Sequence, residues 1–133
     1  MGVGFAGRKS KGSAGERELL NNFWSNSWGG LRCAGSGSAR HPVPDILVSN
    51  GKRVLAFEVK VTKDNTKYFS LQEIEDLRRF AGAFGAHPMV AVKFKTKWYF
   101  INADDLRKTA RSYVASVKLG QTKGLTFENL LRI

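Results

Sequence analysis

The sequence predicts an α/β domain in which helices cover a central mixed β-sheet. Two observations favour this class. Stretches with helical apolar periodicity alternate with β-rich runs, in the order helix, strands, helix, strands, helix. The length of 133 residues is enough for one domain with one hydrophobic core, and no internal repeat or domain boundary interrupts that order.

Charge and cysteine content narrow the function. Lys and Arg total 22 against 11 acidic residues, a net charge of +11, which predicts attraction to polyanions and above all to nucleic acid. The single cysteine, Cys33, excludes an intramolecular disulfide and favours a reducing, cytoplasmic setting. No apolar stretch approaches the length that spans a bilayer, so we expect no membrane partner.

The N-terminal region divides into an arm and a helix. Residues 1–12 are rich in glycine and carry three cations, so we expect a flexible basic arm that wraps DNA, with a solvated tail as the alternative. These cations are Arg8, Lys9 and Lys11. Residues 13–133 are expected to form a single domain. Its first helix should begin with a capping box between Ser13 and Glu16 and end before Gly29. Its apolar stripe comprises Leu19, Leu20, Phe23 and Trp24.

Later elements follow from turn and capping signals. The run "DILVSNGKRVLAFEVKV" predicts a hairpin that turns at Asn50-Gly51, and symmetric pairing across this turn places Asp45 near Ala56. The run "SLQEIEDLRRFAGAFG" predicts a helix that begins with a capping box at Ser70 and ends at Gly85. Two strands, "PMVAVKF" and "KWYFI", should follow. We expect another helix after residue 102 and a short amphipathic piece in "LTFENLLRI".

Charged side chains interrupt the second strand of the hairpin. Side chains alternate along a strand, so Glu58 and Lys60 point to the same face of "RVLAFEVKV". A salt bridge on a half-exposed sheet is one interpretation. Asp45 lies within two residues of Glu58 in the predicted pairing, so a divalent-metal site is the other, with Mg²⁺ as the suited ion. Lys60 would then orient or deprotonate a water, or neutralise charge in the transition state. Glu16 faces the protein body and is either a third acid or only the capping partner of Ser13.

Three stretches resemble the archaeal Holliday junction resolvases, small dimeric members of the PD-(D/E)xK nuclease superfamily with viral relatives. They are "GERELLNNFW", "RCAGSGSARHPVPDILVSNGKRVLAFEVKV" and "RRFAGAFGAHPMVAVKF". The superfamily pattern is Pro44-Asp45, twelve intervening residues, and then Glu58-Val59-Lys60. The resemblance runs from about Gly12 to Phe100, with a weaker echo in "LTFENLL".

The resemblance implies a restriction-endonuclease-like nuclease fold and a site. Asp45 and Glu58 would bind Mg²⁺, for which Mn²⁺ can substitute, with the Val59 carbonyl and Glu16 as further ligands, and Glu16 acting directly or through water. Lys60 would be the catalytic lysine, and Glu16, Asp45 and Glu58 would share the catalytic site with it. Basic and hydroxyl positions would contact DNA: Arg17, Arg32, Ser36, Ser38, Arg40 and Lys93. Which of the two serines matches the family's hydroxyl position stays open.

The resemblance also implies a function and partners. The chain would be a Mg²⁺-dependent endonuclease that acts as a homodimer and cuts four-way DNA junctions by symmetric paired incisions during recombination and repair. The family allows a sliding clamp as a partner, although no motif here argues for one. A general nuclease on the same fold is one alternative. A non-catalytic DNA-binding module is another, disfavoured because converging carboxylates repel phosphate unless a metal is bound.

Overall fold

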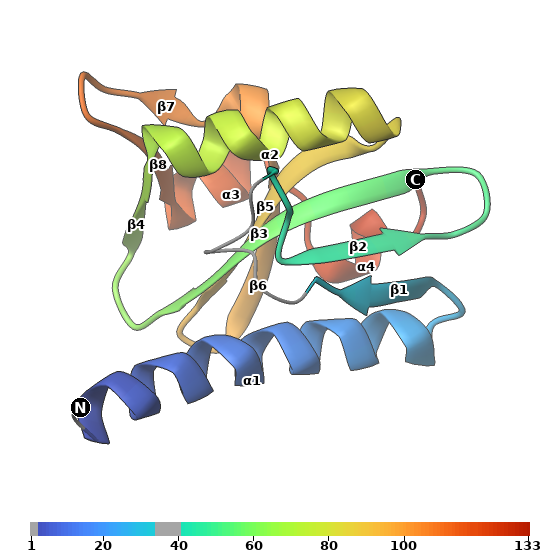
Figure 1. The fold of residues 1–133 in the computed structure, drawn as a ribbon, viewed down its shortest axis with the longest axis horizontal. Helices are drawn as coiled ribbons and strands as arrows, with labels where there is room; N and C mark the ends of the chain where they lie inside the picture. The colour runs from blue at the N-terminus through green and yellow to red at the C-terminus, as the bar shows by residue number, and fades with distance from the viewer. Residues whose placement is uncertain (1–2, 34–40) are drawn as a thin grey trace.

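A mixed five-stranded sheet forms the centre of the molecule, with helices on both faces (Figure 1). The computed structural model describes residues 3–33 and 41–133, and side chains from residue 13 onward. Its elements, in chain order, are α1 (Val3–Ser25), β1 (Gly29–Arg32), β2 (Ile46–Ser49), β3 (Val54–Thr62), β4 (Thr66–Ser70), α2 (Leu71–Phe84), β5 (His87–Phe94), β6 (Lys97–Asn102), the 3₁₀ turn η1 (Ala103–Asp105), β7 (Arg107–Lys108), β8 (Ser112–Ser116), α3 (Val117–Thr122) and α4 (Phe127–Leu130). The predicted fold class is confirmed.

The central sheet has the strand order β1-β2-β3-β5-β6. β3 and β5 are parallel, while the other neighbouring pairs are antiparallel. A parallel pair requires a long connection, and here β4 and α2 supply it. Helix α1 packs on one face of this sheet and α2 on the other, so β3 lies between two helices (Figure 1).

The alternation predicted for β3 is confirmed, because its side chains enter two separate cores. Leu55, Phe57 and Val59 join the core beneath α1, whereas Ala56 joins the core beneath α2. Val61 continues the first face but is 44% exposed, since it lies near the end of the strand. Glu58 and Lys60 share the face of Ala56, so both point toward the α2 side.

The turn between β2 and β3 is wider than predicted. Ser49 pairs with Val54, so residues 50–53 all belong to the loop, and the Asn50 carboxamide accepts hydrogen bonds from the Lys52 and Arg53 amides at 2.9 and 2.8 Å. The symmetric pairing that placed Asp45 near Ala56 is therefore wrong. Ile46 pairs with Phe57, which places the preceding residue, Asp45, beside Glu58.

Helix α1 begins at Val3, ten residues before the predicted start. Ser13 is thus an interior residue, and the capping box predicted between Ser13 and Glu16 is wrong. Leu19 and Phe23 are fully buried as expected, but Trp24 is 59% exposed and donates its indole N–H to the Gly30 carbonyl. The wrapping of DNA by a basic arm at residues 1–12 stays a prediction, because those side chains lie outside the described part.

Helix α1 approaches β3 closely at one residue. A Cβ atom on Gly15 would lie 2.6 Å from Cγ2 of Val61, which is far closer than two carbon atoms can pack. Glycine at this position therefore allows the helix to lie against the strand. The next residue along the helix is Glu16, so this close approach brings an acidic side chain toward the sheet.

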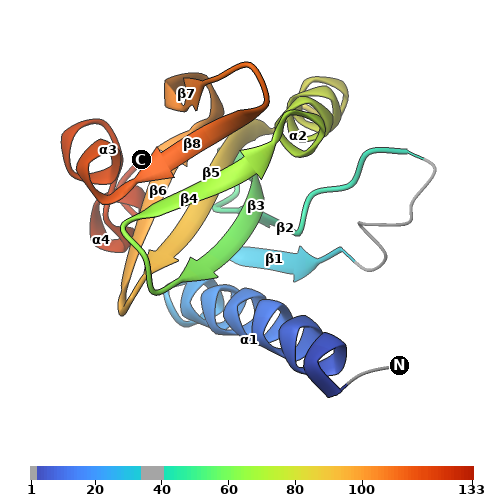
Figure 2. The same cartoon turned by 90° about the vertical axis from the view of Figure 1, so that its left-hand side faces the viewer.

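A second sheet was missed by the sequence analysis. Its three strands have the order β4-β8-β7 and pack over the α2 side of the central sheet (Figure 2). The helix predicted after residue 102 is wrong: Asp104 and Asp105 form only the turn η1, and two strands follow. Tyr113 and Ala115 of β8 enter the core, and this tertiary burial overrides the helical signal. The tail does form the short helix α4.

No helix in the described part of the chain is long and apolar enough to cross a membrane.

Candidate active site

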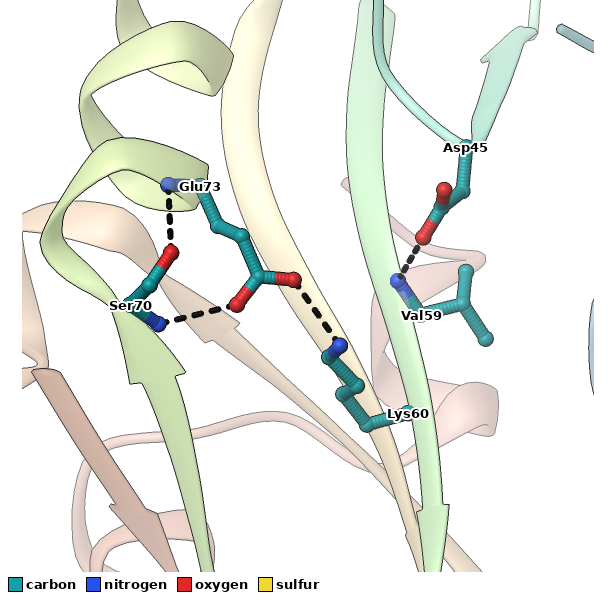
Figure 3. Close-up of polar contacts among 5 residues, drawn as sticks. All are labelled: Asp45, Val59, Lys60, Ser70 and Glu73. Atoms are coloured by element: carbon teal, nitrogen blue, oxygen red, sulfur yellow. Dashed lines mark hydrogen bonds and ion pairs between the residues drawn. The ribbon is translucent and has the colours of Figure 1, made fainter. Parts of the chain in front are cut away.

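Asp45 is fixed against the middle of β3 by two hydrogen bonds. Its amide donates to the Phe57 carbonyl at 2.9 Å, and its carboxylate oxygen Oδ2 accepts from the Val59 amide at 2.8 Å (Figure 3). The preceding residue, Pro44, has no N–H to donate to β3, so the ladder ends here, and the Asp45 side chain is the acceptor for the Val59 amide. The predicted convergence of Asp45 and Glu58 is thereby set by the end of β2.

Glu58 shares a proton with Asp45. Burial raises the pKa of Glu58 to about 9, and the nearby charges of Asp45 and Glu73 and a hydrogen bond with Asp45 add to this, against the opposing charge of Lys60. At neutral pH Glu58 therefore keeps its proton and is hydrogen-bonded to Asp45. Full ionisation of both carboxyls requires additional positive charge at this place.

Lys60 points from β3 to the first turn of α2 (Figure 3). Its ammonium lies 2.8 Å from Oε2 of Glu73 and 5.8 Å from the ring centroid of Phe69. Burial lowers the pKa of Lys60, but the hydrogen bond to Glu73 and the charges of Glu73, Glu58 and Asp45 outweigh it, so the pKa is raised. Within the described residues the ion pair of Lys60 is to Glu73, and the simple salt bridge between Glu58 and Lys60 is not formed.

Glu73 is itself held by the capping box predicted for α2. Its Oε1 accepts from the Ser70 amide at 2.8 Å, while its own amide donates to the Ser70 hydroxyl at 3.0 Å. Burial raises the pKa of Glu73, but the hydrogen bonds from Lys60 and Ser70 outweigh it and lower the pKa overall. The carboxylate is therefore ionised and joins the helix cap to the lysine.

Glu16 lies on α1, which packs on the sheet face opposite to α2, and is near enough to Asp45 for their charges to interact. Its carboxylate forms an ion pair with Nε of Arg32 at 3.1 Å. Burial and the charge of Asp45 raise the pKa of Glu16, while Arg32 and the exposed Arg17 lower it. The predicted proximity of Arg17 and Arg32 to the acidic centre is consistent with these effects.

The pKa of the Cys33 thiol indicates that the three predicted acids, Glu16, Asp45 and Glu58, lie near one another. The Cys33 amide donates to the Asp45 carbonyl at 2.9 Å. Burial raises the pKa of its thiol, and Asp45, Glu16 and Glu58 each raise it further. One side chain at the end of β1 thus experiences all three predicted acids, which places them around a common region.

The donor set fits a magnesium ion. Among the described residues, no three Asp, Glu, His or Cys side chains are gathered closely enough to hold a metal by themselves. Mg²⁺ is usually bound by only one or two carboxylates, with waters and substrate phosphate as the other ligands. Asp45 and Glu58 match this pattern, and their shared proton is the charge that a bound cation would replace.

Lys93 and Glu18 form a separate cluster on the α1 side. The Lys93 ammonium lies 2.8 Å from Oε1 of Glu18, and the Trp98 indole donates to Oε2 of the same carboxylate at 3.0 Å. The Lys93 hydrogen bond lowers the pKa of Glu18, burial opposes this, and the Trp98 hydrogen bond and the charge of Lys93 lower the pKa further. Lys93 neighbours Val61 in the sheet, so it stands on the opposite face from Lys60.

Several predicted DNA-binding residues lie outside the described side chains, so their role stays a prediction. They are Arg8, Lys9, Lys11, Ser36, Ser38 and Arg40.

Comparison with known proteins decides the family. The family described as archaeal Holliday junction resolvase (Hjc) matches residues 7–133. The chain belongs to the archaeal Holliday junction resolvase family. It is 42% identical over 106 residues to the crossover junction endodeoxyribonuclease Hjc of Archaeoglobus fulgidus, covering 79% of this chain and 78% of that protein. It is 30% identical over 127 residues to Hjc of Sulfolobus acidocaldarius, covering 93% and 88%.

A solved structure agrees with this assignment. The Hjc structure of Archaeoglobus fulgidus, described as a Holliday junction resolvase from an archaeal hyperthermophile, superposes with a TM-score of 0.84 at 34% identity. The match covers 90% of this chain and 99% of that one. The resemblance read from the three sequence stretches is thus confirmed.

The structure gives long-range partners to two acidic residues of this resolvase that were not predicted to have them. Glu73 was interpreted only as a capping residue, although its spacing of three from Ser70 was the available signal for its position. Glu18 carries no local signal for a partner, and in the structure its carboxylate binds Lys93 and Trp98. The partners of Glu18 are 75 and 80 residues away in sequence, so no local pattern could reveal them.

Proposed function

We propose that this resolvase is a Mg²⁺-dependent endonuclease that cuts four-way DNA junctions by paired, symmetric incisions. The observation that carries the proposal is the proton-sharing contact between Asp45 and Glu58, beside an ordered Lys60. The family assignment supports the nuclease class and branched DNA as the substrate.

The carboxyls of Asp45 and Glu58 and the carbonyl of Val59 would hold the ion, with Glu16 nearby to act directly or through water. When bound, Mg²⁺ supplies charge neutralisation of the phosphate and activation of water. The Val59 amide keeps the Asp45 carboxylate oriented. Lys60 contributes a fixed positive charge next to the acids, where it can orient the attacking water or neutralise charge that develops on the phosphate.

DNA binding would rely on the excess of positive charge. The net charge of +11 supports binding through backbone phosphates, with a steep dependence on salt. Arg17 and Arg32 lie beside the acidic centre, and the cations of residues 1–12 are proposed to extend the contact along the duplex. Recognition of a branch would then come from its shape more than from its base sequence.

A homodimer suits a twofold substrate, because two related strands need two active sites. On α2, the rings of Phe80 and Phe84 stack with centroids 5.1 Å apart, and Phe84 is 56% exposed. Exposure of a stacked aromatic pair to water is unfavourable, and the same face of a second copy of the chain would cover it. We propose that this face forms the dimer contact.

Organisation and location complete the proposal. Residues 13–133 would form the single nuclease domain, preceded by the basic arm. Work on chromosomal junctions requires access to DNA, so we propose a cytoplasmic location. A sliding-clamp partner has no support in the described part of the chain, and we do not propose one.

The test is cleavage of a labelled four-way junction beside a linear duplex of matching sequence, with Mg²⁺, Mn²⁺ or EDTA. Paired symmetric cuts in the junction, in the presence of either metal only, are the expected result. Equal cutting of both substrates would instead indicate a general nuclease on this fold. Tight binding without cutting under every metal condition would indicate a DNA-binding module and overturn the proposal.

A further inference from the structure

The first turn of α2 carries a carboxylate whose two oxygens have different partners. Oε1 of Glu73 accepts from the Ser70 amide at 2.8 Å, and Oε2 accepts from the Lys60 ammonium at 2.8 Å (Figure 3). A helix cap needs only the first of these bonds. The second links the start of α2 to a charged residue of β3 that is 13 positions away.

The Lys60 ammonium is ordered from two directions. A lysine side chain has a flexible four-carbon stem, so its charge has no defined position unless neighbours fix it. Here Glu73 binds the ammonium on one side, and the ring of the fully buried Phe69 lies 5.8 Å from it on another. Phe69 cannot move because it is packed in the core, so Glu73 supplies the directional contact.

The ion pair is more than a surface contact. The side chains of Lys60 and Glu73 are 30% and 33% exposed, and Glu73 is already fixed by its bond to Ser70 before it meets the lysine. Because one partner is ordered in advance, the pair costs less side-chain entropy than two free side chains would.

We propose that Glu73 is a positioning residue for DNA cleavage, which holds the Lys60 ammonium on the face of the sheet that carries Glu58. This inference rests on the proposed function of Lys60. It assigns to the cap of α2 a second task, because a shift of that helix end would move the lysine with it. A displacement of about 1 Å in a catalytic group can reduce turnover about a hundredfold.

Three variants separate positioning from helix capping. Ser70→Ala removes the hydroxyl that caps the Glu73 amide but leaves the carboxylate on Lys60. Glu73→Ala removes both the backward capping bond and the partner of Lys60. Glu73→Gln offers one acceptor oxygen to these two donors, because its NH₂ group cannot accept, so it keeps at most one of the two contacts. Ser70→Ala is thus the matched control for helix stability, and Glu73→Gln is an intermediate variant that loses the negative charge beside Lys60.

The experiment measures single-turnover cleavage of a four-way junction at saturating protein in Mg²⁺, and the dissociation constant for the same junction in EDTA. Glu73→Ala should slow cleavage about 10- to 100-fold without weakening binding. Ser70→Ala should cleave like the wild type, and Glu73→Gln should fall between the wild type and Glu73→Ala. Equal or faster cleavage by Glu73→Ala, or an equal loss in Ser70→Ala, would overturn the inference.

A second readout does not depend on cleavage. Competitive labelling of amines, followed by mass spectrometry, should find Lys60 protected in the wild type and in Ser70→Ala, and reactive in Glu73→Ala. Equal labelling of Lys60 in the wild type and Glu73→Ala would overturn the positioning role. A wild-type protein that leaves junctions uncut would refute the proposed function alone, while the labelling still decides whether Glu73 fixes the lysine.

Discussion

The Asp45 carboxylate accepts a hydrogen bond at 2.8 Å from the amide of Val59. Val59 lies two residues after Phe57, whose carbonyl accepts a hydrogen bond from the Asp45 amide. A side chain therefore completes the edge of a β-ladder and at the same time is hydrogen-bonded to Glu58. The Asp45 carboxylate thus has both a structural role and a proposed catalytic role, so a substitution at this residue must distinguish loss of stability from loss of metal binding.

Asp45→Asn keeps the shape and an oxygen for the Val59 amide but loses the charge. We expect cleavage to fall roughly a hundredfold or more, as the loss of several kcal/mol of metal-dependent stabilisation would produce. Binding of the junction in EDTA should stay equal or become tighter, since a negative charge near phosphate is removed. Cleavage assays and gel-shift titrations check both effects, and wild-type cleavage in this variant would exclude Asp45 from the site.

Glu58 should make the metal-free protein less stable as pH rises. The pKa of Glu58 is about 9 in the folded protein against an ordinary value of 4.5, so the folded state binds a proton that the unfolded chain releases between these limits. Stability from this group is complete below about pH 4.5 and is lost progressively toward pH 9. The free energy of unfolding of Glu58→Gln should therefore exceed that of the wild type by about 1 kcal/mol or more at pH 8 in EDTA.

Urea titrations of both proteins at pH 5 and pH 8 measure this difference. Added Mg²⁺ should raise the stability of the wild type by linkage and should have little effect on Glu58→Gln. An identical pH dependence of the two proteins would contradict the assignment of the raised pKa to Glu58.

Glu18→Ala should destabilise the packing of α1 on the sheet. The substitution leaves the indole N–H of the buried Trp98 without its acceptor, and such a loss costs about 1–3 kcal/mol. Glu75→Ala, an exposed change on α2, is the control and should have little effect. The midpoint of urea unfolding checks this prediction, and an equal midpoint in both variants would contradict it.

Phe84→Ser should convert the proposed dimer into monomers with an intact fold. Phe84 is 56% exposed and stacks on Phe80, so its loss removes apolar area from the proposed contact and not from the core. Light scattering after size exclusion measures the mass. Leu31→Ser, at another exposed apolar position, should leave the mass unchanged, and a persistent dimer in Phe84→Ser would place the interface elsewhere.

Replacement of the three arm cations, Arg8, Lys9 and Lys11, by alanine should weaken junction and duplex binding alike. Each phosphate contact that is lost lowers the slope of log affinity against log salt by about 0.9. Filter binding between low and moderate salt provides the slope. An unchanged slope would show that the arm does not contact DNA.

Local signals predicted the parts of the fold that local contacts stabilise. The capping box of Ser70 and Glu73 and the left-handed Gly85 mark both ends of α2, and both are present in the structure. The alternation of β3 was equally readable, because a buried strand with charges on alternate positions permits only one assignment of faces.

Features that depend on the detailed geometry of a loop or on distant partners were not predictable in the same way. The Asn50 side chain organises a four-residue loop, so an assumed two-residue turn shifted the pairing of Asp45. The strand containing Tyr113 is stabilised by the core beneath α2, which a single sequence does not display. The acids of the candidate site could be proposed from the sequence because their pattern is short, whereas the partnership of Glu73 with Lys60 depends on the packing of α2 on β3.

Because α1 approaches β3 so closely at Gly15, a larger side chain at this position would change the distance between the helix and the strand. Alanine, serine and valine at this position would act as spacers of increasing size against Val61, since even a Cβ atom would lie 2.6 Å from its methyl group. Each spacer would lift the helix and carry Glu16 away from Asp45 without altering any charged residue. The size of the side chain at position 15 would therefore set the distance between Glu16 and Asp45, and with it the strength of their electrostatic interaction.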